Sequence, residues 1–459
     1  MARFFFCGIG GIGMSAIALY LKKLGHDVLG SDRSFDMGKN YQMRDRLLSN
    51  GIVLFPQDGS GINQQIDVFV VSSAVESSII DVKKALDFDL KIKKRAEVLA
   101  DIFHTFSKRI AVAGTSGKTT VTAMTAHILY QLDKSPVMIN GGISLNSYHN
   151  EPLSNLIFDT KDTCVIEADE SDGSINLYTP YISVLTNVSL DHKPLDEIKP
   201  LFEAFLARSQ KGCVINNDCK ETKNLVLPKS DIVSFSIEKE PSSTLFASCV
   251  RQTSEGILFY LNGREYCLPF IGVHNLANAL AAVGACMLMG LNIDDALNAL
   301  KTFKGTMRRL EKVGVTNGMT VIDDYAHNEE KIKASLRALK EMASNLFIVY
   351  QPHGFAPLKL MKDGLIQMLQ NELKDNIHWL QLPVYYVGGT VEKTISSQDI
   401  VFPLQKQGKK AFCFETRNEV IDYLLKNVKS QDVVAVMGAR DDTLSLFAKE
   451  IFNQMGEIK

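Results

Sequence analysis

The segment around Lys118 constrains the fold of this chain most strongly. An apolar run at 110–113 leads into the sequence GTSGKTT at 114–120, and a helical stretch follows at 121–130. In a strand–loop–helix unit of this kind the backbone amides cradle phosphates, the lysine reaches the β- and γ-phosphates, and the next hydroxyl can bind Mg²⁺. Val112 stands where a strict Walker A motif has its first glycine. We expect a nucleoside triphosphate site on an α/β fold.

A second glycine-rich turn lies near the N-terminus. The predicted strand Arg3–Cys7 leads into GIGGIG at 8–13, and a helix is predicted over 14–24. Glycines at this spacing let the backbone approach a diphosphate at the helix N-terminus, and Asp32 stands where an acid can bond a ribose hydroxyl. The pattern fits a nicotinamide or flavin dinucleotide and any other nucleotide diphosphate equally well. The alternative is a tight turn without a ligand.

Strands and helices alternate along the whole chain, which predicts parallel sheets covered by helices. This alternation of strands and helices begins again at Arg109 and at Thr320, each time after a polar stretch. A chain of 459 residues is also too long for one ordinary domain. We therefore predict three α/β domains, at 1–107, 108–304 and 305–459.

The composition of the chain argues against several classes of protein. The chain has 50 basic and 52 acidic residues, a net charge of −2, which gives no global basis for nucleic-acid binding. Its 8 cysteines include no CxxC pair, so we expect neither a disulfide scaffold nor a structural zinc site, and we expect a reducing, cytoplasmic location. The longest uncharged apolar run, at 279–291, is too short to span a bilayer and predicts a buried helix.

Acidic and polar residues follow the predicted strands of the middle domain. The sequence EADESD occupies 167–172, directly after an apolar strand. Magnesium prefers few carboxylates together with substrate oxygens, so one of these acids is a candidate ligand. The alternative is a solvated acidic turn. His192 follows the next predicted strand, 184–187, and is a candidate for metal or phosphate, although a lone histidine is more often structural.

Three later groups carry polar side chains that suit a nucleotide. The sequence HNLAN at 274–278 opens the apolar helix, either as helix caps or as nucleotide contacts. The pair Arg308-Arg309 offers cations for phosphate. The sequence DDYAH at 323–327 follows a predicted strand, where ligands of α/β proteins collect, although its two aspartates can instead cap the helix 330–341.

Taken together and in this order, these blocks resemble the Mur ligase family, the ATP-dependent amide-bond-forming enzymes of peptidoglycan precursor synthesis. The resemblance runs along nearly the whole chain. It is carried by the blocks GxGxxG, GTxGKTT, EADESD, TN…DH, HNxxNA, RR and DDYAH. The N-terminal and acidic blocks are most similar to the branch that joins L-alanine to UDP-N-acetylmuramate, and the ligases that recycle a tripeptide onto the same nucleotide sugar are near relatives.

The resemblance implies a fold and a chemistry. The fold is α/β with a Rossmann-like UDP-binding domain, a central P-loop-type ATPase domain with a parallel sheet, and a C-terminal Rossmann-like domain that brings in the amino acid. The implied cofactors are ATP and Mg²⁺, and the implied intermediate is an acyl phosphate. The expected partners are UDP-N-acetylmuramate and L-alanine, with no nucleic acid and no membrane, in a monomer or homodimer. The alternatives to a ligase are a dinucleotide-dependent oxidoreductase and a non-catalytic Mur-like binding protein or regulator.

The resemblance also assigns roles to individual residues. The catalytic set is Lys118 at the γ-phosphate, Glu167 and His192 at the metal, and Arg309 at phosphate. The UDP-sugar set is Gly8, Gly10, Gly11, Ile12, Gly13, Met14, Ser15, Asp32, Ser72 and Ser73. The ATP set is Gly114, Thr115, Ser116, Gly117, Lys118, Thr119, Thr120, His274, Asn275, Asn278, Arg309, Asp324 and His327, with Asp324 at the ribose. The metal set is Thr119, Glu167 and His192.

The chain departs from the alanine-adding branch in its C-terminal domain. Gly354 and Pro357 stand where that branch carries arginines, which would clamp an amino-acid carboxylate bidentately. The block at 437–444 also differs, so Arg440, together with His353, is a candidate for the amino-acid site. L-alanine is the expected acceptor, and the alternative is a paralogue that adds another amino acid or a recycled tripeptide.

Overall fold

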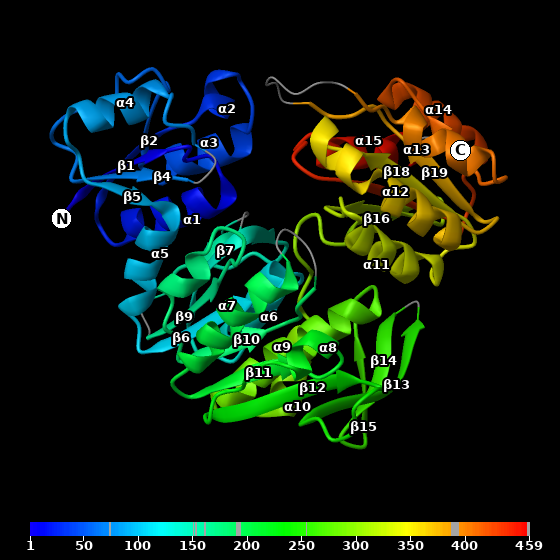
Figure 1. Cartoon of the computed structure of the whole chain (residues 1–459), viewed down its shortest axis with the longest axis horizontal. Coiled ribbons are helices and arrows are strands. Elements are labelled where there is room, and N and C mark those ends of the chain that lie inside the picture. The colour runs from blue at the N-terminus through cyan, green and yellow to red at the C-terminus, as the bar shows by residue number, and fades with distance from the viewer. Residues whose placement is uncertain are drawn as a thin grey trace. The chain divides into compact units, whose positions relative to one another are not determined.

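The computed structural model of the chain describes residues 1–72, 75–149, 151, 154–159, 162–189, 194–253, 255–386 and 394–456. The described strands form three sheets and alternate with helices, so the predicted α/β class is confirmed (Figure 1). The chain divides into two compact units. The first comprises Met1–Cys249, Phe259–Tyr266 and Ala277–Lys304, and the second comprises Val250–Leu258, Cys267–Leu276 and Gly305–Lys459. The domain boundaries near residues 107 and 304 stay a prediction.

A five-stranded parallel sheet of the order β3-β2-β1-β4-β5 begins the first unit. Its strands are β1 (Arg3–Cys7), β2 (Asp27–Ser31), β3 (Val53–Phe55), β4 (Val68–Val71) and β5 (Ile92–Lys94). Its helices are α1 (Ile12–Lys23), α2 (Arg33–Asp36), α3 (Tyr41–Ser49), α4 (Ile80–Asp87) and α5 (Arg95–His104). The strand order reverses between β1 and β4. The glycine turn after β1 therefore lies at the switch point where doubly wound sheets bind their ligands.

A ten-stranded sheet follows, of the order β15-β14-β13-β12-β11-β10-β6-β9-β7-β8. Its strands are β6 (Lys108–Ala113), β7 (Val137–Ser144), β8 (Ser154–Ile157), β9 (Thr163–Glu167), β10 (Ile182–Leu185), β11 (Gly212–Asn216), β12 (Asp231–Ile237), β13 (Leu245–Thr253), β14 (Gly256–Leu261) and β15 (Arg264–Leu268). Its helices are α6 (Lys118–Gln131), the 3₁₀-helix η1 (Ser174–Leu177), α7 (Leu195–Ala207), α8 (Lys220–Lys223), α9 (Val273–Leu288) and α10 (Ile293–Leu300). Strand β6 pairs in parallel with β10 on one side and β9 on the other, so the segments that leave these three strands meet at one edge.

Helix α1 is buried on nearly all sides, and this joins the first two sheets. Every residue from Met14 to Leu21 is buried, because α1 packs against β7 and β8 as well as against β2 of its own sheet. A helix that is apolar all round is stable only when it is covered in this way. One buried cluster consequently runs from Phe6 through α1 to Phe205. The first two predicted domains share a continuous core in the first unit.

A buried histidine ties the helix after the phosphate loop to the end of α10. His127 of α6 is fully buried, and its Nε2 lies 3.2 Å from the Ala299 carbonyl and 2.9 Å from the Thr302 hydroxyl. A carbonyl can only accept, so Nε2 carries the proton and Nδ1 accepts from the Tyr148 hydroxyl at 3.0 Å. Burial lowers the pKa of His127 to about 4. The ring is therefore neutral at pH 7.

Acidification is expected to destabilise the first unit through His127. The unfolded side chain titrates near its ordinary pKa of about 6.5, whereas the folded one titrates near 4, so the unfolded state binds the extra proton between these values. The free energy of unfolding should fall by about 2 kcal/mol from pH 7 to pH 5 from this group alone. Urea unfolding at both pH values measures the loss. His127→Asn should show a smaller pH dependence than the wild type, and an equal one contradicts the assignment.

A six-stranded sheet organises the second unit, in the order β16-β17-β21-β18-β19-β20. Its strands are β16 (Glu311–Thr316), β17 (Met319–Asp324), β18 (Leu346–Gln351), β19 (Ile377–Gln381), β20 (Ala411–Cys413) and β21 (Val433–Gly438). Its helices are α11 (Glu329–Lys340), α12 (Phe355–Glu372), α13 (Gln398–Gln405), α14 (Arg417–Asn427) and α15 (Leu444–Gly456). Strands β17, β21, β18, β19 and β20 are parallel, and among the described strands of this sheet only β16 runs antiparallel.

Two sequence expectations need correction in detail. The predicted strand at 184–187 ends at Leu185, because Thr186 and Asn187 bond to the phosphate loop instead of continuing the sheet. Asp323 and Asp324 do not cap the next helix. They end strand β17, and Asn328 caps α11 by accepting from the Lys331 amide.

Among the described residues, no helix combines the length and the apolar character that a membrane span needs. All the cysteines are free, and Cys7, Cys164, Cys213 and Cys286 are buried.

Candidate functional site

The glycine turn at 8–13 joins the carboxyl end of β1 to helix α1. The Gly8 amide donates to the Ser31 carbonyl (2.8 Å), which fastens the turn to β2. Gly8 has a φ of +84°, and a Cβ at Gly10 would stand 2.8 Å from Asp32 Oδ2. Glycine is required at both positions, at one for conformation and at the other for space. The turn thus has the tight backbone that a diphosphate site needs.

Asp32 braces this turn. Its Oδ2 accepts from the Gly10 amide (2.8 Å), and its Oδ1 accepts from the amide (2.8 Å) and the hydroxyl (2.5 Å) of Ser34. Both carboxylate oxygens are therefore engaged by the chain itself. The ribose contact expected for Asp32 stays a prediction, and the structure adds a bracing function for the same carboxylate.

The beginning of α1 favours an anion. Gly11 is its N-cap, and no described side chain caps the helix, so the first amides have no such partner. The guanidinium of Arg95 lies beside the turn, since a Cβ at Gly13 would stand 3.5 Å from Arg95 Nη1. Free helix amides and a nearby cation together attract phosphate. The predicted UDP-binding residues Gly8–Ser15 are thus brought together in one turn.

The phosphate loop is shaped by two glycines in the left-handed region. Gly114 has a φ of +128°, and a Cβ there would stand 2.1 Å from Thr186 Oγ1. Gly117, the N-cap of α6, has a φ of +89° and no described side-chain cap on its helix. The Thr115 hydroxyl accepts from the Ser189 amide (3.0 Å). The loop is therefore fixed at its edges, and its glycine N-cap leaves the first amides of α6 without a cap from that residue.

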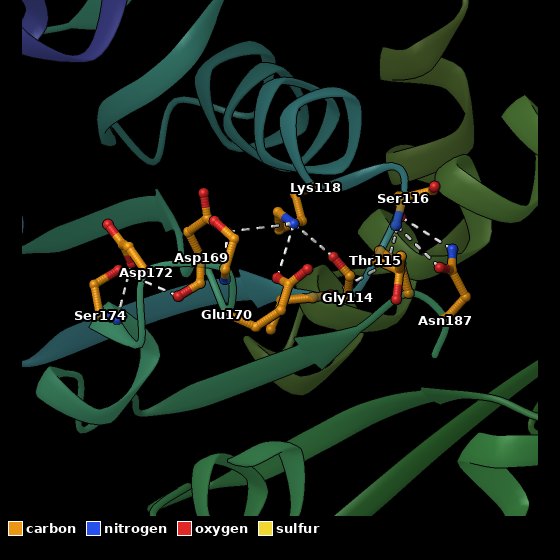
Figure 2. A network of polar contacts seen from close by, with 12 residues as sticks. Gly114, Thr115, Ser116, Lys118, Asp169, Glu170, Asp172, Ser174 and Asn187 are labelled. Atoms are coloured by element: carbon orange, nitrogen blue, oxygen red, sulfur yellow. Dashed lines mark hydrogen bonds and ion pairs between the residues drawn. The ribbon is translucent and has the colours of Figure 1, made fainter. Parts of the chain in front are cut away.

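Lys118 lies in the interior of the site between an acid and a loop carbonyl (Figure 2). Its Nζ donates to Glu170 Oε2 (2.8 Å) and to the Gly114 carbonyl (2.7 Å), and Asp169 Oδ1 lies 3.9 Å away. Burial alone would lower the pKa of Lys118, but the charges of Glu170 and Asp169 outweigh burial and raise it. The ammonium group therefore stays charged, as a phosphate-binding lysine must.

Asn187 fixes the other side of the loop (Figure 2). Its Oδ1 accepts from the Ser116 amide and its Nδ2 donates to the Ser116 carbonyl, both at 3.0 Å. Thr186 adds a hydrogen bond from its hydroxyl to the same carbonyl (2.6 Å). Both residues leave strand β10, next to β6. The residues that follow the neighbouring strand β10 therefore fix the conformation of the loop.

The predicted metal ligands lie at the same sheet edge. Glu167 ends β9, paired with Val112 of β6, and its Oε1 accepts from the Gly141 amide (2.9 Å). Thr119 stands in the first turn of α6, and Asn140 donates from Nδ2 to its carbonyl (3.2 Å). The Oδ1 of Asn140 is buried without a hydrogen-bond partner among the described residues. Carboxylate and amide oxygens are the donor types that Mg²⁺ prefers. The metal roles of Glu167 and Thr119 stay a prediction.

Two predicted site residues, Ser73 and His192, lie outside the described residues. Ser72 is described and directly follows β4, at the carboxyl edge that also carries the glycine turn. Thr120 is buried in the first turn of α6, behind the phosphate loop.

Helix α9 carries three predicted nucleotide-binding residues at its beginning. Asn278 belongs to the first unit and reaches the phosphate loop, since a Cβ at Gly117 would stand 2.5 Å from its Oδ1. His274 and Asn275 belong to the second unit. His274 is exposed, and Asn275 donates to the Ile271 carbonyl (2.8 Å). Asn278 is the member of this group that the structure brings to the loop.

The two neighbouring arginines of the second unit differ. Arg308 is 8% exposed, donates to the Gly438 carbonyl (2.7 Å) and pairs with Asp323 (3.4 Å). Arg309 is half-buried, and its guanidinium lies 5.2 Å from the centre of the Tyr325 ring. Arg308 therefore stabilises the fold. The guanidinium of Arg309 makes no hydrogen bond within the described residues, so its N–H donors can bind phosphate.

Asp324 and His327 sit at the carboxyl edge of the six-stranded sheet. Asp324 is buried and accepts from the Ser335 hydroxyl and from the Leu310 amide (3.3 Å). Burial raises its pKa. The ring of His327 lies 5.2 Å from that of His353, and burial lowers the pKa of His327 to about 4, so this ring is neutral at pH 7.

Sequence reasoning missed several residues of these sites. The sequence does not distinguish Glu170 from the other three acids at 167–172, and it predicts Asn187 as the end of a strand. Asn140, Arg95 and Asn155 carried no local signal. Asn155 of β8 donates to the Ile12 carbonyl (2.8 Å) and the Ser15 hydroxyl (3.1 Å), which only the packing of α1 on β8 brings about. A polar residue directly after a central strand was the available signal for Asn187.

A charged lysine in a phosphate loop and a second glycine turn at a sheet switch point define a nucleotide-using enzyme. Three family models match the chain: Mur ligase family, catalytic domain, over 3–107; Mur ligase middle domain over 112–286; and Mur ligase, glutamate ligase domain, over 308–440. The chain belongs to the Mur ligase family and is an ATP-dependent ligase. Its glycine turn is thus part of a ligase and not of an oxidoreductase.

Relatives that match over nearly the whole chain are similar to it in one branch of the family. The UDP-N-acetylmuramate–L-alanine ligase of Fusobacterium nucleatum is 31% identical, with 99% of this chain and 97% of the relative covered. The ligase of the same name from Lachnospira eligens is also 31% identical, with 95% of each covered. The crystal structure of UDP-N-acetylmuramate–alanine ligase from Thermotoga maritima superposes with a TM-score of 0.81 at 26% identity, with 100% of both chains covered.

Proposed function

We propose that the chain joins L-alanine to UDP-N-acetylmuramate in an ATP-dependent step of peptidoglycan precursor synthesis. The observation that carries the proposal is Lys118, held charged in a phosphate loop of a chain whose full-length relatives bear the name of that ligase. A lysine aimed at a γ-phosphate has no use in a dinucleotide-dependent oxidoreductase, and its retention argues against a non-catalytic binding protein.

The chemistry follows from the nature of a carboxylate, which is a poor acyl donor because its leaving group would be oxide. A carboxylate oxygen of the sugar attacks the γ-phosphorus of ATP, the bond to the β,γ-bridging oxygen breaks, and ADP leaves. The acyl phosphate then accepts the amine at its carbonyl carbon. The tetrahedral intermediate collapses with loss of phosphate and of the amine proton. Such transfer needs positioning and charge neutralisation more than covalent help.

The chain supplies both requirements. Lys118 neutralises the γ-phosphate and the amides at the start of α6 hold the phosphates. The role of Arg309 at phosphate stays a prediction. The amides at the start of α1 hold the UDP diphosphate. The ion pair with Glu170 keeps the Lys118 ammonium charged and positioned at the loop.

The oxygen ligands at the loop fit a magnesium ion. Thr119 offers a hydroxyl, Glu167 a carboxylate, and Asn140 a buried amide oxygen without a partner among the described residues. When bound, Mg²⁺ would neutralise phosphate charge and orient the transferred group. The share of His192 in this site, the cytoplasmic location and the monomeric or homodimeric state stay predictions.

The test is phosphate release from ATP, Mg²⁺ and UDP-N-acetylmuramate in a screen of L-alanine, other L- and D-amino acids and the recycled tripeptide. We expect release with L-alanine. With an ¹⁸O-labelled sugar carboxylate, one label should appear in the released phosphate, because the acyl phosphate passes that oxygen on. Release only with another amino acid or with the tripeptide would make the chain a paralogue. No release with any amine, or no label in the phosphate, would contradict the proposal.

A further inference from the structure

The loop after β21 presents an arginine that the fold itself does not use. Arg440 is exposed, and its guanidinium has no hydrogen bond or ion pair within the described part of the chain. Its backbone has a φ of +63°, in the left-handed region that favours glycine. A bulky side chain at such a position costs about 1 kcal/mol relative to glycine. No described contact of the Arg440 side chain therefore stabilises the fold.

The loop that carries Arg440 is firmly held. Asp441 is 2% exposed, and its Oδ2 accepts from Arg417 Nη2 (2.7 Å), while its Oδ1 accepts from the Thr443 amide (3.0 Å). Arg308 donates to the carbonyls of Gly438 (2.7 Å) and Asp441 (3.3 Å). Two arginines and one buried acid thus fix the backbone on both sides of Arg440, so its side chain projects from a rigid base.

Strand register brings Arg440 beside His353. Gln351 of β18 is paired with Gly438 of β21, and both strands are parallel. His353 and Arg440 each lie two residues beyond this pair, at the same sheet edge, where adjacent strands are about 5 Å apart. Burial, and after it the charge of Arg440, lower the pKa of His353, which agrees with this proximity.

His353 contributes a second sign of a ligand. Its Nδ1 is buried and has no hydrogen-bond partner among the described residues. Buried polar atoms in native proteins are nearly always paired, so an unpaired one next to a free guanidinium points to a missing acceptor or donor. A carboxylate beside an amine offers acceptors for the guanidinium and for a ring N–H at once.

We infer that Arg440, with His353, binds the α-carboxylate of the incoming amino acid and so sets the amine specificity of the ligase. This inference rests on the proposed function. Gly354 has a φ of +74° and a Cβ there would stand 3.2 Å from Pro357 Cδ, so a cation at that position would be strained. The rigid loop of β21 offers the charge instead.

The test compares L-alanine with L-alaninamide, which lacks the carboxylate charge. The wild type should prefer L-alanine in kcat/KM by about 10- to 100-fold, the usual range for a charged hydrogen bond. Arg440→Gly should bring the two substrates within about 3-fold of each other, mainly through KM for L-alanine, with KM for ATP unchanged. Arg440→Lys should keep part of the preference. Lys406→Ala, an exposed cation of the same unit, is the matched control.

Stability separates this function from a structural one. Glycine adopts a φ of +63° without strain, so Arg440→Gly should unfold at no lower a temperature than the wild type. A lower unfolding temperature with an intact preference would overturn the inference, and so would a rise in KM for ATP alone, which would place Arg440 at phosphate. A wild type that turns over no amine contradicts the proposed function itself, and the inference falls with it. If the wild type turns over a different amino acid, the same comparison applies to that acid and its amide.

Discussion

Replacement of Lys118 by alanine is expected to reduce ATP-dependent phosphate release by about 1,000-fold or more. Lys118 is the one loop cation of the first unit that the structure places against an acid at the phosphate edge, within the described residues. Its removal leaves the γ-phosphate charge without this partner in the transition state, where charge neutralisation matters most. Initial rates of phosphate release at saturating ATP measure the effect.

The alanine variant also leaves Glu170 buried without its ion-pair partner, which destabilises the fold on its own. Lys118→Arg separates the two effects, since it keeps a charge beside Glu170 but changes the shape of the donor. We expect Lys118→Arg to unfold near the wild-type temperature and still to lose most activity. Lys83→Ala, on the exposed face of α4, should change neither quantity. Full ligation by Lys118→Ala would disprove the mechanism.

Replacement of Gly114 by alanine is expected to lower the free energy of unfolding by about 2–4 kcal/mol and to weaken ATP binding at least about 10-fold. The φ of +128° is strained for alanine, and the new Cβ would stand 2.1 Å from Thr186 Oγ1 and 2.9 Å from the Asn187 carbonyl oxygen. The backbone atoms cannot move aside without opening the loop that Asn187 holds. Urea unfolding and calorimetric titration with ATP measure the two effects.

Gly25→Ala is the matched control for Gly114→Ala. Gly25 lies in the same unit with a φ of +88°, and a Cβ there meets nothing within 4 Å. It should therefore show only the cost of the left-handed backbone, about 1 kcal/mol, with unchanged ATP affinity. If both variants lose equal stability and both bind ATP normally, the close packing of the phosphate loop has no functional importance.

Local patterns in the sequence predicted local structure well. The strand at 3–7 was confirmed at its exact bounds, and the glycine spacings at 8–13 and 114–117 marked the turns correctly. Such features depend on the sign of φ and on short apolar runs, which a few neighbouring residues determine. The strand at 184–187 was wrong at its end, because Asn187 bonds to a loop 71 residues away in sequence.

Arg308 and Arg309 show the limit of reading residue types alone. Both offer the same charge to a phosphate in the sequence, but only burial and the pairing of Arg308 with Asp323 distinguish an anchor from a free donor. The same holds for the acids at 167–172. The cluster was evident, whereas the choice of Glu170 as the partner of Lys118 depended on where β9 ends relative to α6.

The α/β class, the two glycine turns, the phosphate loop with Lys118 and the ligase family could be predicted from the sequence, because each depends on short local patterns or on their order along the chain. The assembled sheets were needed to show that Glu170 pairs with Lys118, that Asn187 holds the phosphate loop, that α1 is covered by β7 and β8, and that Arg440 emerges beside His353. These contacts depend on strand order. Placing β6 between β9 and β10, or β21 beside β18, is a property of how whole sheets bury their apolar faces, and no single segment carries it.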